Sequence, residues 1–170
     1  MQTNRFRYSV AAIGIVAGLG LAASTGLAGT FTNVLVPSDE TGVPEQASHG
    51  AWLAATGEAV AVVDQPTHTV TVSAENLVPG GLYTVWYVEE QLIGMSAGPA
   101  GGVPDNEFRA DATGTAEITF EVPADNAYDR LVVAYHADDQ THGESPGEMG
   151  TVTFEHLSGE WPAGGIITGQ

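Results

Sequence analysis

Apolar and polar residues alternate at a period of two in three separate segments of this chain. Residues 68–74, 116–122 and 151–155 place apolar side chains at every second position, mostly with threonine, serine or glutamate between them. Successive side chains of a β-strand point to opposite faces, so each segment predicts a strand with one buried face and one wet face. No segment after residue 28 keeps an apolar period of 3.6, so no long helix is predicted there.

Two further runs, residues 82–88 and 131–136, are apolar on both faces and predict central strands that are covered on both sides. Shorter strands are predicted at residues 31–36, 51–56 and 59–63. Turn-forming residues separate these runs at 79–81, 112–114 and 123–126. About seven to eight short strands without a helix predict an all-β fold, an antiparallel sandwich with one core, over residues 29–160.

The first 28 residues have the pattern of a secretory signal peptide. Arg5 and Arg7 precede an apolar run that ends with the small residues Gly26 and Ala28. We therefore expect a cleavable signal helix at residues 1–28, cut before Gly29, and a secreted or cell-surface protein. The alternative is a signal retained as a membrane anchor, since the run is marginally long enough to span a bilayer.

The charge of the chain excludes several functions. It has 21 acidic residues, four arginines, no lysine and no cysteine, with a formal net charge of −17. Such a surface repels nucleic acids and anionic lipids, and disulfides and thiol chemistry are absent. The acidic residues are spread along the chain without an EF-hand loop, which favours a salt-adapted (halophilic) surface over a set of calcium sites.

One stretch carries a resemblance to a known fold. The segment NLVPGGLYTVWY (residues 76–87) resembles the L-x-P-G-x-x-Y-x-V corner of fibronectin type III and other immunoglobulin-like domains. The matching residues are Leu77, Pro79, Gly80, Tyr83 and Val85. The resemblance implies that the tyrosine hydroxyl bonds back to the backbone of the turn. Residues 60–154 are also similar to immunoglobulin-like domains of uncharacterised bacterial and archaeal exported proteins, which implies an immunoglobulin-like fold but no activity.

The segment GMSAG (residues 94–98) matches the G-x-S-x-G pattern of serine hydrolases, with Ser96 at the nucleophile position. That motif functions at a turn between a strand and a helix. Glycine and proline follow it here instead of a helical pattern, so we interpret the segment as a tight loop. Hydrolysis at Ser96 remains a minor alternative to a protein without enzymatic activity.

The segment YHADDQTHGESPGE (residues 135–148) combines two histidines with several carboxylates. Imidazole and carboxylate are ligands for zinc or copper, so His136 and His142 with Asp138, Asp139 or Glu144 form a candidate metal site. The preferred interpretation is an acidic surface turn in which Asp138 bonds to the nearby backbone. A divalent cation is the one cofactor that the sequence leaves open.

Two other histidines fall on strands. Strand parity places His68 on the face of Val70 and Val72, and His156 on the face of Phe154. We predict that His68 and His156 meet if their two strands pair antiparallel. We also predict that His136 and His156 lie at opposite ends of their sheet, which would keep them from forming one site.

These observations favour a non-enzymatic exported module with a binding or structural role at the cell surface. Its partner would be a protein or glycan that contacts sheet edges and the loops at 89–105 and 137–150. The apolar segments at residues 29–39 and 161–170 could complete the domain's own sheet or exchange with a second copy, with residues 161–170 otherwise a C-terminal tail. The alternative is a zinc- or copper-binding protein, or a small metalloenzyme, that uses the loop at 136–148.

Overall fold

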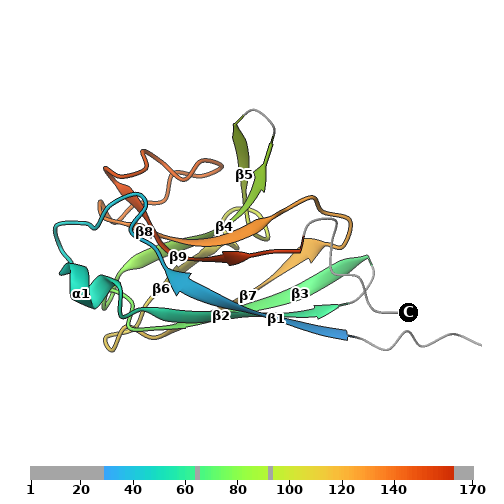
Figure 1. The fold of residues 1–170 in the computed structure, drawn as a ribbon, viewed down its shortest axis with the longest axis horizontal. Helices are drawn as coiled ribbons and strands as arrows, with labels where there is room; N and C mark the ends of the chain where they lie inside the picture. Colours follow the sequence, from blue (N-terminus) through green and yellow to red (C-terminus); the bar gives the residue numbers. More distant parts are fainter. Residues whose placement is uncertain (1–28, 64–65, 92–93, 163–170) are drawn as a thin grey trace, which may run out of the picture.

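The computed structural model describes residues 29–63, 66–91 and 94–162, and these fold into two facing layers of antiparallel strands (Figure 1). The predicted all-β, sandwich-like fold is confirmed. The signal peptide predicted at residues 1–28 lies outside the described residues. The elements are β1 (Gly29–Pro37), α1 (His49–Trp52), β2 (Thr56–Val63), β3 (Thr67–Glu75), β4 (Leu82–Glu90), β5 (Met95–Pro99), β6 (Glu107–Arg109), β7 (Ala116–Pro123), β8 (Arg130–His136) and β9 (Thr153–Glu160).

Strand β1 belongs to both layers. Its residues 29–35 pair with β2, and its last two residues pair with β9. One layer has the order β1-β2-β3-β7 and the other the order β5-β4-β8-β9, with β6 also paired to β4. Glycines flank Leu35 where β1 crosses: a Cβ at Gly57 would lie 3.2 Å from the Leu35 Cβ, and one at Gly159 would lie 2.8 Å from its Cδ2. The absence of side chains at these two positions lets the three strands approach closely.

The core fills the space between the layers. The side chains of β3 and β7 that alternate inward, such as Val70 and Phe120, face those of β4 and β8, such as Val85 and Leu131. The alternation predicted for residues 68–74 and 116–122 is confirmed, with polar residues on the outer face. Trp161 also packs in this core, with its ring centroid 5.8 Å from Phe31 and 5.1 Å from Tyr87.

The outer face of the β4-β8-β9 layer is covered as well. Trp86, Val88, Val132 and Ala134 form a second small apolar cluster there. The burial of residues 82–88 and 131–136 on both faces is therefore confirmed. In β9 the prediction of one wet face is wrong, because Thr153–Leu157 are all buried. Thr153 on the outer face donates a hydrogen bond to the Pro146 carbonyl at 2.5 Å, so the loop at 137–150 covers this part of the strand.

Two local predictions are also wrong. Residues 51–56 do not form a strand along their length, because α1 begins after Ser48, whose Oγ accepts a hydrogen bond from the Ala51 amide at 3.2 Å. This cap turns Trp52 into the core, where its side chain is 1% exposed. The GMSAG segment is largely strand β5 rather than a loop, and with the short β6 the described residues form nine strands, where about seven to eight were predicted.

The only helix in the described ranges is α1, which has four residues. Within those ranges, therefore, no helix could reach across a bilayer.

Candidate metal centre

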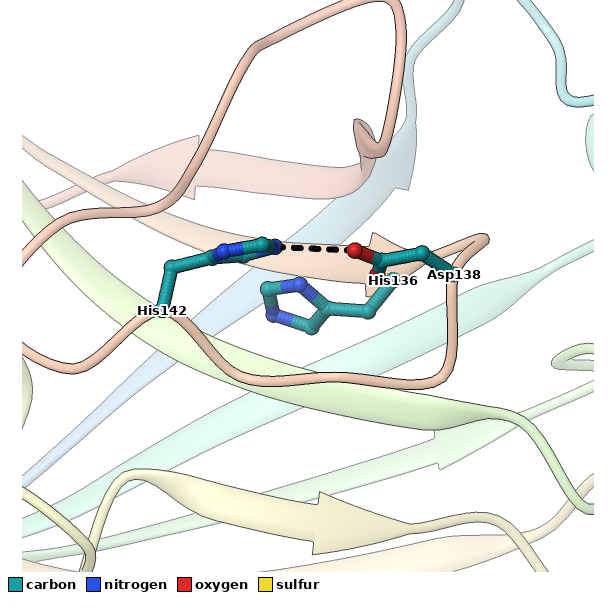
Figure 2. Close-up of side chains that lie close together, drawn as sticks. All are labelled: His136, Asp138 and His142. Carbon is teal, nitrogen blue, oxygen red and sulfur yellow. Dashed lines mark ion pairs between the residues drawn. The ribbon is translucent and has the colours of Figure 1, made fainter.

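The end of strand β8 and the loop at 137–150 bring three of the predicted ligands together (Figure 2). One ligating atom each from His136, Asp138 and His142 lies within 4.8 Å of the other two. In Figure 2 the His136 ring lies beside the ion pair of His142 and Asp138, and one ring nitrogen faces that pair. Asp139 and Glu144, the other carboxylates predicted, are not part of this group.

His136 is held rigidly by threonines on both neighbouring strands. Its Nε2 lies 2.7 Å from the Thr84 Oγ1, and its Nδ1 lies 3.3 Å from the Thr153 Oγ1. The Thr153 hydroxyl donates to the Pro146 carbonyl, so it accepts from Nδ1–H, and Nε2 then accepts from the Thr84 hydroxyl. Trp86 completes the chain by donating its Nε1–H to Thr84 at 2.7 Å. This pattern of donors holds a neutral imidazole.

The electrostatic environment agrees with a neutral His136. The side chain is 1% exposed, and burial lowers its pKa, with a further lowering from His142. The carboxylates of Asp138 and Glu107 oppose this shift. Since metal ions bind imidazole that carries no proton at the ligating nitrogen, a lowered pKa keeps His136 available to a metal at neutral pH.

Asp138 and His142 form the more exposed half of the site. The Asp138 Oδ2 lies 3.2 Å from the His142 Nε2, with the two side chains 25% and 30% exposed. The other Asp138 oxygen accepts from the Gln140 amide at 3.2 Å, which is the local turn bond predicted from the sequence. Gly147 lies against the His142 ring, where an added Cβ would be 2.5 Å from its Cδ2. The loop thus folds tightly around this histidine.

Two imidazoles and one carboxylate are a suitable ligand set for zinc or copper. Ligands of a tetrahedral zinc ion lie about 3.3 Å apart, so distances between the ligand atoms would shorten by about 1.5 Å or less on binding. Because Nδ1 carries the proton in this arrangement, binding through Nδ1 would require that proton to move to Nε2, which would then donate to Thr84. Three protein ligands would leave one coordination position for water or another ligand.

The predicted bond from the Tyr83 hydroxyl back to the turn is present. The Tyr83 hydroxyl accepts a hydrogen bond from the Val78 amide at 2.8 Å, between the buried Leu77 and Val85. Pro79 precedes Gly80, whose φ is +70°. This turn is joined to the loop of the candidate site by Arg109, which donates to the Gly80 carbonyl at 3.0 Å and pairs with Asp139 at 2.6 Å.

His156 extends this corner in a way that the sequence did not indicate. Its Nε2 donates to the Trp52 carbonyl at 3.0 Å, so its Nδ1 accepts from the Tyr83 hydroxyl at 3.1 Å. Its ring stacks on Trp52 with centroids 3.6 Å apart, and burial lowers its pKa to about 4. Only its shared face with Phe154, which also contacts Trp52, could be predicted from strand parity.

The remaining histidine predictions are corrected by the strand pairing. His68 and His156 do not meet through paired strands, because β3 pairs with β2 and β7 whereas β9 pairs with β8 and β1. His136 and His156 are not at opposite ends of their sheet, since His136 is paired with Thr153, three residues before His156. They are kept apart because His136 faces the outer side of the layer and His156 faces the core.

Ser96 lies on the exposed strand β5, beside β4, and not at a turn from a strand into a helix. Its hydroxyl donates to the Glu89 carboxylate at 3.4 Å. A carboxylate at that distance orients the hydroxyl, but the strand geometry differs from that of the serine hydrolase motif.

Comparison with protein families, with curated proteins and with solved structures gives no match to this chain. The protein is thus described by its own structure: it has an all-β, sandwich-like fold, and the cluster of His136, Asp138 and His142 is its candidate metal centre.

Proposed function

We propose that the protein is a non-enzymatic binding module of the cell exterior, and that its best-defined site binds one divalent zinc or copper ion. The convergence of His136, Asp138 and His142 carries this proposal. The sequence favoured an acidic turn over a metal site. In the structure the two are compatible, because the residues that form the turn also form the ligand cluster. The bond from Asp138 to the turn leaves its second oxygen directed at His142.

Three further features support the metal over a simple surface turn. His136 is fully buried in a hydrogen-bonded pocket that keeps its ring neutral and in place, whereas a turn needs no such support. The other two ligands are partly exposed, which provides a route for an ion from solvent. The formal net charge of −17 draws cations to the surface.

The test is metal analysis of the untagged protein. We expect about one zinc or copper ion per chain by elemental analysis after dialysis, and a saturable titration in competition with a chelator. His142→Ala should abolish both. His49→Ala is the matched control, because His49 also pairs with an aspartate, Asp39 at 3.0 Å, without a third ligand. Absence of stoichiometric metal, or equal loss in both variants, would refute the site.

The exterior location rests on the signal-like residues 1–28. Mass spectrometry of the protein expressed in its native host should find a chain that begins at Gly29 in the medium or at the cell surface. A full-length chain confined to the cytoplasm would contradict this part of the proposal without affecting the metal site.

A further inference from the structure

A small pocket lies on the outer face of the β4-β8-β9 layer, beside the candidate metal centre but separate from it. It has a volume of about 100 Å³ and is lined mainly by apolar side chains of β4, β5, β8 and the loop at 137–150. Figure 1 shows β5 projecting away from the two layers. Met95 and Met149 line the pocket and are 67% and 40% exposed. We call it the Met95–Met149 pocket.

The size of the pocket limits what could enter it. A cavity of roughly 150 Å³ accommodates a benzene ring, so one of about 100 Å³ fits a slender chain better than a ring. The walls are suited to an unbranched aliphatic chain, because Val88 and Val132 are apolar and the two thioethers can adjust their shape.

The base of the pocket carries an unsatisfied buried acid. Glu155 lines the pocket and is 4% exposed, and its Oε1 has no hydrogen-bond partner among the described residues. The other oxygen, Oε2, lies 3.3 Å from the Arg130 Nη2. A buried carboxylate oxygen without a donor is unfavourable, so a ligand that brings an N–H to this oxygen would gain binding free energy.

The local charge selects the sign of that ligand. Arg130 is flanked by two carboxylates, Glu155 and Glu40, the second with its Oε2 3.8 Å from the Arg130 Nη1. One guanidinium thus faces two carboxylates, Glu155 in the pocket lining and the exposed Glu40 outside it, which leaves the surroundings of the pocket negative. The surrounding surface is strongly acidic too, which favours a cation over a neutral donor.

We propose that the Met95–Met149 pocket binds the side chain of a lysine on a partner protein. The aliphatic stem would lie between the two methionines, and the ammonium group would donate to the Glu155 Oε1. The chain itself contains no lysine, so this group must come from another molecule. This site does not depend on the metal centre, and it gives the binding module a partner of defined chemistry.

The two methionines allow a direct test. Met95 and Met149 are the only methionines in residues 29–170, so methyl-¹³C labelling of that chain gives two signals, one from each. Nα-acetyl-lysine methylamide, titrated in the presence of EDTA, should shift both signals saturably and bind at least tenfold more tightly than its norleucine analogue. Absence of a saturable shift, or equal affinity of the two, would overturn the proposal.

Variants separate the parts of the site. Glu155→Gln should weaken binding of the lysine derivative at least tenfold, while Glu144→Gln, an equal charge change at an exposed position of the loop at 137–150, should not. Ala97→Leu fills the pocket from β5 without altering the pair of Glu155 and Arg130, and should abolish binding even if Glu155→Gln fails to fold. Binding of n-butylammonium but not of the lysine derivative would overturn the assignment to a partner's lysine.

Discussion

The buried His156 makes the stability of the protein depend on pH. Burial lowers the pKa of this histidine from 6.5 to about 4 in the folded state. Its two nitrogens are already used, with Nε2 donating to Trp52 and Nδ1 accepting from Tyr83, so a second proton would break the bond to the tyrosine. The unfolded chain therefore binds more protons than the folded chain between pH 6.5 and pH 4, and stability is lost as the pH falls through this window.

The magnitude follows from the two pKa values. Titration of one group from 6.5 to about 4 costs about 2 kcal/mol of unfolding free energy between pH 7.5 and pH 5, and about 3.4 kcal/mol once the folded form is also protonated. The pH dependence of the whole protein sums the contributions of all its ionisable groups. The contribution of His156 is isolated by comparing the protein with His156→Gln, which cannot be protonated, at each pH.

The assay is urea unfolding followed by tryptophan fluorescence from pH 7.5 to pH 5. The lower limit avoids the pH at which so acidic a protein loses its net charge and aggregates. We expect His156→Gln to be less stable at pH 7.5, with the gap narrowing by about 2 kcal/mol at pH 5. A gap between the protein and His156→Gln that is constant over this range would refute the reasoning.

Three other perturbations test the packing and the metal centre. Tyr83→Phe removes the acceptor for Val78 and the donor for His156, and should cost about 2 kcal/mol in urea unfolding; an unchanged midpoint would contradict the role of this corner. Trp161→Ala should cost about 3–5 kcal/mol, because the ring fills the core beside Phe31 and Tyr87, and a loss below 1 kcal/mol would show that the ring is dispensable. Gly147→Ala should lower zinc affinity at least tenfold by chelator competition, since a Cβ there displaces the His142 ring; unaltered affinity would mean that the ring position does not matter.

The alternation of apolar residues was sufficient to predict the strands that bury one face. In β3 and β7 the wet face is exposed and the inner face is packed, so the period of two is visible in the sequence. It failed at β9, where a loop covers the outer face and the polar Thr153 and Glu155 are buried with partners. From the sequence alone, a polar residue in a strand that faces solvent looks the same as one that is buried against a hydrogen-bonding partner.

The candidate site could be predicted in part. The residue types of His136, Asp138 and His142 indicated metal ligands, but their convergence depends on how the loop folds. Asp139, which lies between the two ligands, has a φ of +59°, a left-handed conformation that turns the chain so that His142 returns to Asp138. Gly147, with a φ of +88°, lets the following chain close against the His142 ring. Spacing alone does not contain this information. The segment at 51–56 shows the same limit. Its apolar pattern predicts a strand, but the N-cap at Ser48 stabilises a helical turn over residues 49–52 instead.

The sharing of β1 between the two layers has a consequence for the order of folding. Val36 and Pro37 pair with Ser158 and Leu157, so nearly the whole polypeptide separates two hydrogen-bonded neighbours. A growing chain can join β1 to β2 early, but it cannot close the sandwich until its last strand has been synthesised. Completion of the native state must therefore wait for a full-length, unconstrained polypeptide, and a chain cut short before β9 should leave apolar surface open to aggregation.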